Sequence, residues 1–273
     1  MLLSRGGGNG FFQKGFSELK MTTLDDRFES ELEVFRTEAG VGTQFFYAYL
    51  AVHAAASAHK PVLKLLNQSP LFWNTSLAAL QTATFIVLGR IFDQKSAHNL
   101  GRVLRIAQDN PEIFSKVSLG RRRQGKNSEP PSWLGEFLRD AYEPTSKDFR
   151  RIRAHVHKWR RIYETNYRDL RHKVFAHKAA DRDETVALFG KTNIRELQRM
   201  FAFLNSLYEA LWQSFVNGGR LVLRPLRYSV KRMRALPSPG TGRWATQERI
   251  THEVTEFLLS ASRVTNATQR WSG

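Results

Sequence analysis

Residues 146–178 read SKDFRRIRAHVHKWRRIYETNYRDLRHKVFAHK. Apolar and aromatic side chains recur in this stretch at steps of three and four residues, which is the period of one face of an α-helix. The stripe consists of Ile152, Val156, Trp159, Tyr163, Tyr167, Leu170, Val174 and His177. The spacing predicts one long amphipathic helix that opens at Ser146 and continues to about Ala179.

The rest of the chain has the same helical character and contains no repeat at a fixed period. Apolar positions at helical spacing predict further helices over residues 24–36, 43–59, 75–91, 97–108, 133–141, 193–216 and 244–261. Thr23 is suited to cap the first of these helices, and Asn74 or Thr75 is suited to cap the third. The pattern therefore predicts an all-α fold.

Glycine and proline indicate where these helices stop. Gly40 and Gly42 are expected to break the helical pattern after the first helix, and Pro61 is expected to end the second helix. Residues 118–132 contain Gly, Pro and three consecutive Arg residues, which predicts a basic loop. Residues 180–192 are expected to form a second loop.

The predicted elements divide the chain into four segments. These are a flexible leader at 1–20, a helical bundle at 21–217, a basic arm and linker at 218–243, and a C-terminal helix with a tail at 244–273. Met21 could be the true start, because the capped helix pattern begins just after it. Residues 220–233 alternate apolar and basic side chains, as a half-buried strand or an extended arm would, and Pro225 argues against a central strand.

The composition excludes several classes of function. The chain has 273 residues, of which 41% are hydrophobic, and this is enough for a globular core. It has no Cys, which excludes disulfides, iron–sulfur clusters, thiolate zinc sites and a cysteine nucleophile. The longest small and apolar run, residues 45–58, is shorter than the roughly 18 residues of a membrane span. We therefore expect a cytoplasmic protein without a membrane partner.

The formal charge of +17 is concentrated in three clusters. Residues 113–128 carry five basic and no acidic residues, residues 150–178 carry ten basic and two acidic residues, and residues 210–247 carry seven basic and no acidic residues. Basic runs without acidic partners are typical of surfaces that bind phosphate backbones. RNA is therefore the expected partner, and a merely soluble basic surface is the alternative interpretation.

Common catalytic motifs are absent from the sequence. It contains no Walker loop, no GxGxxG after a strand, no GxSxG and no HExxH. His155 and His157 are two residues apart and project from different faces of a helix. We therefore expect no joint metal site at these histidines and no metal or cofactor in the protein.

The residues that could carry chemistry lie in RDLRHKVFAHK, residues 168–178. RNA cleavage by internal transesterification needs a base for the 2′-hydroxyl, an acid for the leaving oxygen and a cation for the phosphorane charge. His177 can act as base or acid, and Arg171 can hold phosphoryl oxygens. Because His177 lies on the apolar stripe, a structural histidine in the core or at an interface is the alternative.

This stretch resembles the motif of the HEPN superfamily, which is an Arg (Arg171), a polar residue directly after it (His172) and a His four to six residues beyond (His177). The form RHKVFAH is most similar to the abortive-infection, toxin-type branch. Leu88–Asp93, with the sequence LGRIFD, also resembles a segment of that branch. The resemblance covers about residues 24–216. It implies a helical bundle, usually dimeric, that cleaves RNA without a metal, although some members are non-catalytic.

We accordingly expect a HEPN-like antiparallel helical bundle that acts as a metal-independent endoribonuclease, either a toxin or an antiphage effector, and leaves a cyclic phosphate. The candidate catalytic residues are Arg171, His177 and His172. The candidate RNA-binding residues are Arg168, Lys173, Lys178, Arg224, Arg227 and Lys231. Arg90 and Asp93 are candidate supporting residues. Their spacing allows them to form an ion pair with each other on one helix. In the alternative interpretation, Asp93 orients either Arg171 or His177 from the neighbouring helix.

Alternative functions and partners follow from the same residues. The protein could instead be a non-catalytic nucleic-acid-binding or scaffold protein that uses the arm. A nucleotidyltransferase-type antitoxin is a partner that the resemblance allows.

On a straight helix Arg171 and His177 project roughly 120° apart, so one pair does not converge on a single phosphate without a helix distortion. A homodimer with its two-fold axis along the His177 stripe would place two such pairs around one cleft.

Overall fold

The computed structural model describes residues 23–125, 129–177, 180–226, 228 and 245–271 of the chain. Every regular element in these residues is a helix, which confirms the all-α prediction. The leader predicted at residues 1–20 lies outside the described residues, as do Lys178, Arg227 and Lys231.

The helices begin and end as follows. They are α1 (Leu24–Ala58), α2 (Lys60–Gln68), α3 (Pro70–Phe92), α4 (Leu100–Asp109), η1 (Pro111–Phe114), α5 (Lys116–Gln124), α6 (Leu134–Asp140), α7 (Ser146–Asn166), η2 (Leu170–Ala176), α8 (Arg182–Gly190), α9 (Ile194–Asn217) and α11 (Thr246–Trp271). Thr23 caps α1 as predicted, because its hydroxyl accepts a hydrogen bond from the N–H of Asp26 at 3.1 Å.

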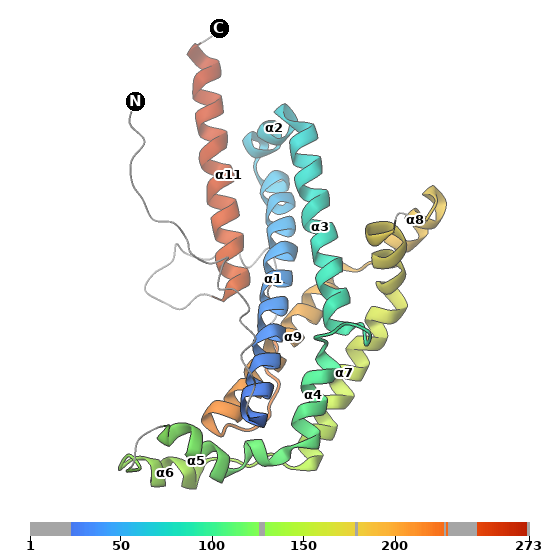
Figure 1. The fold of residues 1–273 in the computed structure, drawn as a ribbon. Coiled ribbons are helices and arrows are strands. Elements are labelled where there is room, and N and C mark those ends of the chain that lie inside the picture. Colours follow the sequence, from blue (N-terminus) through green and yellow to red (C-terminus); the bar gives the residue numbers. More distant parts are fainter. Residues whose placement is uncertain (1–22, 126–128, 178–179, 227, 229–244, 272–273) are drawn as a thin grey trace, which may run out of the picture.

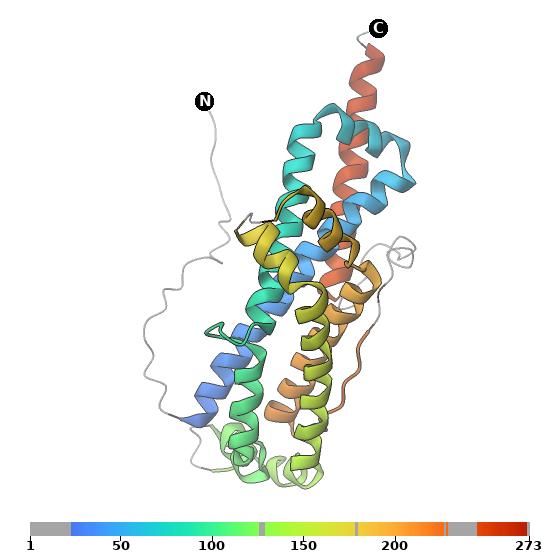
Figure 2. The same cartoon turned by 90° about the vertical axis from the view of Figure 1, so that its right-hand side faces the viewer.

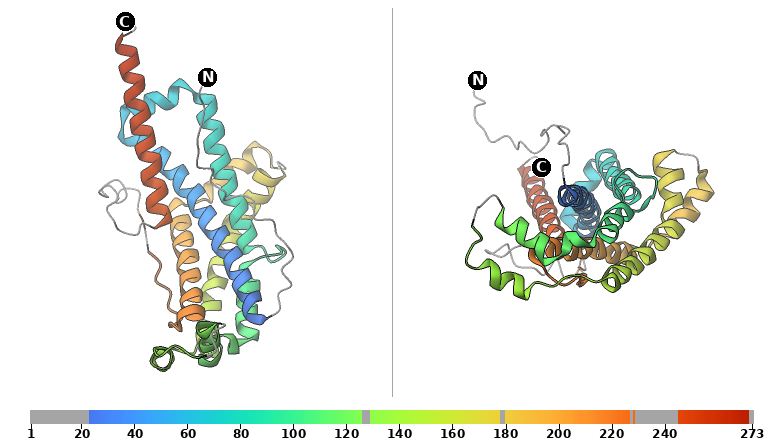
Figure 3. Two further views of the ribbon diagram at one scale, coloured as in Figure 1. Left: turned by 60° about the vertical axis from the view of Figure 1, so that its left-hand side comes forward. Right: turned by 60° about the horizontal axis from the view of Figure 1, so that its bottom comes forward.

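The long helices alternate in direction and form an elongated antiparallel bundle (Figure 1). α1 runs along the centre, α3 and α4 return beside it, and α7 and α9 then run in opposite directions (Figure 2). α5 and α6 lie across one end of the bundle, and α11 packs on α1 and α2 toward the other end (Figure 3). This arrangement leaves one face of α7 beside α4 and places η2 against α3.

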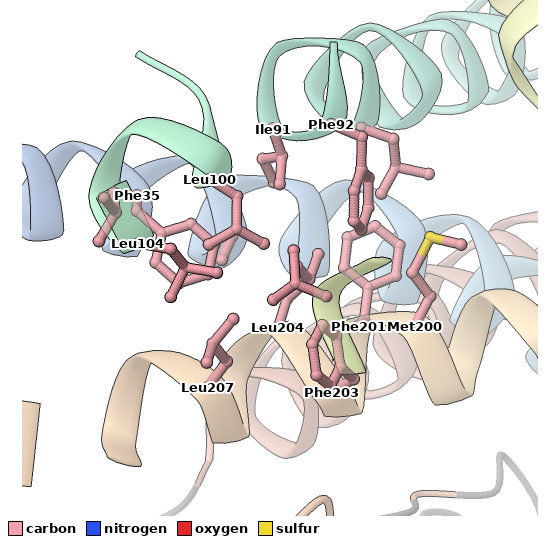
Figure 4. Packing of buried hydrophobic residues seen from close by; sticks show 14 of the residues in the cluster. Phe35, Ile91, Phe92, Leu100, Leu104, Met200, Phe201, Phe203, Leu204 and Leu207 are labelled. Carbon is pink, nitrogen blue, oxygen red and sulfur yellow. The ribbon is translucent and has the colours of Figure 1, made fainter. Parts of the chain in front are cut away.

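The main core lies where α1, α3, α4 and α9 meet (Figure 4). Phe35, Ile91, Leu104 and Leu204 come from these four helices and are each at most 4% exposed. The stripe of α7 adds Tyr163 to the same cluster. Burying each side chain of this size contributes roughly 1.5–3 kcal/mol, so the core fixes the position of α7 relative to α3.

α1 continues unbroken through Gly40 and Gly42, so the break predicted there is wrong. At Gly42 the helix comes closest to its neighbours, because an added Cβ would lie 2.8 Å from Cγ1 of Val87 and 2.9 Å from Cε1 of Phe201. At Gly40 an added Cβ would meet nothing within 4 Å. Packing against α3 and α9 outweighs the cost of about 1 kcal/mol that each glycine brings to a helix.

Two prolines lie at the starts of helices. The predicted helix end before Pro61 is confirmed, because α1 ends at Ala58 and His59 is its C-cap. Pro61 itself lies in the first turn of α2, a helix that was not predicted, at a position where its missing N–H removes no helical hydrogen bond. α3 likewise begins with a proline, Pro70, so Asn74 and Thr75 lie inside this helix and do not cap it.

Both predicted loops contain helix. The basic loop expected at residues 118–132 contains most of α5, and the loop expected at 180–192 contains α8. Asp181 caps α8 by accepting a hydrogen bond from the N–H of Glu184 at 2.8 Å. This cap, followed by acidic residues in the first turn, was a helix signal in the sequence. Residues 218–226 and 228 form no strand, so the strand alternative is wrong for these residues, and 227 and 229–233 lie outside the described residues.

α3 is the one helix in the described residues whose length and composition would suffice to cross a membrane. In the structure, 39% of its most apolar window is buried against the rest of the protein. A core helix of a globular protein meets the same criteria, so this property is a weak indication. The absence of a membrane partner stays a prediction.

Alanine substitutions at the two glycines of α1 should change stability in opposite directions. We expect Gly40→Ala to raise the free energy of unfolding by about 0.5–1 kcal/mol, because alanine favours the helix and meets no neighbour. We expect Gly42→Ala to lower it by about 1–3 kcal/mol, because the methyl group overpacks against Val87 and Phe201. Urea unfolding followed by circular dichroism measures both changes. A stabilised Gly42→Ala variant would contradict the close approach of these helices.

Candidate functional site

The long helix predicted from Ser146 to Ala179 divides into two elements. α7 ends at Asn166, and residues Leu170–Ala176 form η2, a π-helical segment. In η2 the N–H of His177 donates to the carbonyl of His172, five residues earlier, at 3.1 Å, whereas an α-helix bonds residues four apart. The prediction of one continuous helix is therefore wrong at its C-terminal end. Single π turns of this kind occur frequently at functional sites.

Buried side chains hold η2 against the bundle. Tyr167 follows α7 and is fully buried, and its hydroxyl donates to Oε1 of Glu196 in α9 at 2.6 Å. Phe175 of η2 stacks on Phe85 of α3 with ring centroids 5.2 Å apart. Figure 2 shows η2 crossing α3. Because both ends of η2 are anchored, the backbone that carries its polar side chains is fixed.

The π turn brings His172 and His177 together. Their ring centroids lie 4.5 Å apart with the planes at 70°, and both side chains are exposed. In a regular α-helix, residues five apart project about 140° from each other, so the contact depends on the wider turn. The exposure of His177 shows that the alternative of a core histidine is wrong.

Arg171 passes directly over Gly89 of α3. A Cβ added to Gly89 would lie 2.7 Å from Nε of Arg171 and 3.3 Å from the hydroxyl of Tyr163, so a glycine here leaves room for the guanidinium. Nε of Arg171 and the hydroxyl of Tyr163 are buried and have no hydrogen-bond partner among the described residues. Buried donors are nearly always paired in folded proteins. Two unpaired donors side by side therefore suit an acceptor that a ligand would supply.

Tyr163 remains a neutral donor at physiological pH. Burial raises the pKa of its phenol to about 12, and the nearby positive charge of Arg171 opposes this rise. A cavity of about 210 Å³ lies beside Tyr163 and is also lined by Asp93, Glu164 and Arg168. The structure thus brings Asp93 and Arg168, two of the predicted residues, to the edge of the Arg171 site.

Arg90 and Asp93 do not form the predicted pair. Nε of Arg90 donates to Oε2 of Glu38 in α1 at 2.8 Å, so the expected ion pair within α3 is wrong. Asp93 caps the end of α3, and its Oδ1 accepts the N–H of Lys95 at 3.1 Å. In the part of the chain that the structure describes, Asp93 makes no hydrogen bond to Arg171 or His177.

The predicted RNA-binding residues are not gathered in one place. Lys173 forms an ion pair with Glu184 of α8 at 2.5 Å, and this hydrogen bond raises the pKa of Lys173. Arg224 is exposed, and its backbone N–H donates to Oγ of Ser206 at 2.6 Å. Arg224 lines a cavity together with residues of α1, α9 and α11. None of the motif residues Arg171, His172 and His177 lines this cavity.

His155 and His157 line two different cavities, so they project from different faces of α7 as predicted. Within the described ranges, no three His, Asp or Glu side chains are grouped as metal ligands would be.

Three residues around the site were not singled out from the sequence. Gly89 lies within LGRIFD, so the segment was noticed but its glycine was not. Tyr163 was assigned only to the apolar stripe, and its buried hydroxyl gave no signal. Glu196 follows Asn193 at the start of a predicted helix, and nothing in the sequence indicated that it bonds Tyr167.

The helical bundle, together with Arg171 and His172 in η2 and His177 directly after it, defines an all-α protein of the HEPN type. The chain belongs to the AbiU2 family, a HEPN-type abortive-infection family, because the family model HEPN_AbiU2 matches residues 25–230. This range covers the bundle from α1 to α9. No curated protein and no solved structure matches the chain. The match confirms the resemblance to abortive-infection HEPN proteins.

Removing the hydroxyl groups of the two buried tyrosines should have unequal effects on stability. We expect Tyr163→Phe to raise the free energy of unfolding by about 1–3 kcal/mol, because the substitution removes a buried hydroxyl that has no hydrogen-bond partner. We expect Tyr167→Phe to lower it by about 1.5–3 kcal/mol, because the Glu196 carboxylate loses a hydrogen bond. Urea unfolding of both variants makes the comparison. Equal losses would contradict the assigned hydrogen bonds.

Proposed function

We propose that the protein is an endoribonuclease of abortive infection, a toxin or antiphage effector that cleaves cytoplasmic RNA without a metal. The observation that carries this proposal is the cluster on η2. One seven-residue helical segment and the residue after it carry a partly buried guanidinium, Arg171, which lies over Gly89, and two exposed imidazoles in contact with each other, His172 and His177. Membership of an abortive-infection family supports the same function.

The proposed reaction uses these three side chains. One imidazole takes the proton of a ribose 2′-hydroxyl, the 2′-oxygen attacks phosphorus, and the bond from phosphorus to the 5′-oxygen breaks. The other imidazole donates a proton to the departing 5′-oxygen, which leaves a 2′,3′-cyclic phosphate and a 5′-hydroxyl end. Arg171 stabilises the negative charge on the non-bridging oxygens. Because side chains supply the base, the acid and the cation, the step needs no metal.

The test is cleavage of total RNA by the purified protein in the presence of EDTA. We expect cleavage with cyclic-phosphate ends, and a rate at least about 100-fold lower for His177→Ala, His172→Ala and Arg171→Ala, because each removes a proton-transfer or charge-stabilising group. His155→Ala is the matched control, since this exposed histidine lies on α7 outside the cluster. RNA binding without cleavage would instead support a non-catalytic scaffold protein.

Gly89→Ala tests the position of Arg171 while all three reactive side chains are retained. The added methyl group would overlap Nε of Arg171, so we expect the guanidinium to move and cleavage to slow. Gly40→Ala is the control, because it makes the same change in a helix at an open position. Unchanged cleavage by Gly89→Ala would remove the role given to this contact.

A shared site in a homodimer is the second part of this proposal. Two imidazoles on one chain could provide base and acid without a partner, whereas a two-fold axis near His177 would duplicate Arg171 and both histidines around one cleft. Mixing an Arg171→Ala chain with a His177→Ala chain decides between these arrangements. We expect a shared site to regain part of the activity in the mixed dimer. A monomer that cleaves RNA at the full rate would exclude sharing.

A further inference from the structure

Three buried hydrogen-bond donors without partners follow one another along α7 and η2. They are Nε of Arg160, the hydroxyl of Tyr163 and Nε of Arg171. Nε of Arg160 forms an ion pair with Oε1 of Glu164 one turn along α7, at 3.6 Å, a distance too long for a hydrogen bond. Leaving one such donor unpaired costs about 1–3 kcal/mol. These three donors are therefore open to hydrogen-bond acceptors from outside the chain.

A groove between α4 and α7 begins at the first of these donors. Its volume is about 530 Å³, and Arg105, Arg153, His157 and Arg160 line it together with one acidic residue, Asp109. Figures 1 and 2 show α4 and α7 side by side along this length. Nη1 of Arg153 reaches across to Oε1 of Gln108 on α4 at 3.3 Å. The charge of the lining therefore suits an anion.

The groove leads toward Arg171. Gln94 lines both this groove and the 210 Å³ cavity that contains Tyr163 and Arg168, and Tyr163 lies with Arg171 at Gly89. Arg153, His157 and Arg160 stand on one face of α7 because they are spaced by four and three residues. Arg168 follows the end of α7 and lines the 210 Å³ cavity. A polyanion that follows this face arrives at the π turn.

We propose that the groove between α4 and α7 binds the phosphate backbone of single-stranded RNA and guides the strand to Arg171. Arg105, Arg153 and Arg160 bind successive phosphates, and His157 adds a further polar contact. The groove has the volume of a small-molecule pocket, which fits nucleotides of one strand and not a duplex. The ligand class rests on the proposed ribonuclease function, whereas the groove and the buried Nε of Arg160 that lines it do not.

Binding is measured with a fluorescein-labelled single-stranded RNA of about 12 nucleotides, by anisotropy, in the non-cleaving His177→Ala protein. The groove variant adds Arg153→Ala and Arg160→Ala. The matched control adds Arg150→Ala and Arg161→Ala, which remove the same charge from exposed positions of α7 that line neither cavity.

We expect the groove variant to raise the dissociation constant about tenfold or more, because two charge-assisted hydrogen bonds are lost. The slope of log K against log salt should also become shallower by about 1.4, the value for two phosphates on a single strand. The control should change the dissociation constant by less than about threefold, since it loses only general attraction.

Equal effects of the groove and control variants would overturn the proposal. Efficient displacement of the RNA by polyglutamate of similar length would also overturn it, because the groove would then bind acidic chains in general. If the groove variant weakens RNA binding but no preparation cleaves RNA, the groove assignment stands and the ribonuclease function fails. If the protein cleaves RNA but the groove variant binds RNA as well as the parent protein, the ribonuclease function stands and the groove assignment fails.

Discussion

The close approach of α1 to α3 and α9 at Gly42 is the constraint on which the rest of the structure depends. Val87 and Phe201 occupy the space that a side chain at this position would need, and Phe201 also stacks on Phe46 with centroids 5.2 Å apart. This packing fixes the course of α3. Two residues after Val87, Gly89 then presents an open backbone to Arg171. The core and the candidate site therefore share one short segment of α3.

The π turn of η2 links the packing of this core to the positions of the candidate catalytic side chains. Tyr167 is bonded to Glu196 on α9, and Phe175 is stacked on Phe85 of α3, so the chain between them must span a distance set by two other helices. A wider helical turn satisfies both contacts and aligns residues five apart. The contact between His172 and His177 is thus a consequence of packing at positions that carry no chemistry themselves. It also gives one chain two imidazoles, which weakens the geometric reason for requiring a second chain.

Positive charge on α7 is divided among its faces. Arg153, His157 and Arg160 face the groove beside α4, while Arg151 and His155 face a cavity beside α9. Part of the charge is already neutralised within the chain, as for Lys173 with Glu184 and Arg151 with Asp148. A count of basic residues therefore overstates the charge available to a nucleic acid. On the face beside α4, Arg160 is also ion-paired, with Glu164, but its buried Nε makes no hydrogen bond among the described residues.

The sequence by itself determined the helical class, most helix positions and the residues of the motif, because these depend on local periodicity and on residue type. The Arg–His spacing also showed that a regular helix would separate Arg171 from His177, so that either a helix distortion or a second chain was needed. Only the tertiary structure decided where that distortion falls, since it arises from contacts of Tyr167 and Phe175 with helices far away in the sequence. The unbroken α1 and the partner of Arg90 were mispredicted for the same reason. Helix propensity and i,i+3 spacing are local, whereas the space at Gly42 and the position of Glu38 are set by neighbouring helices.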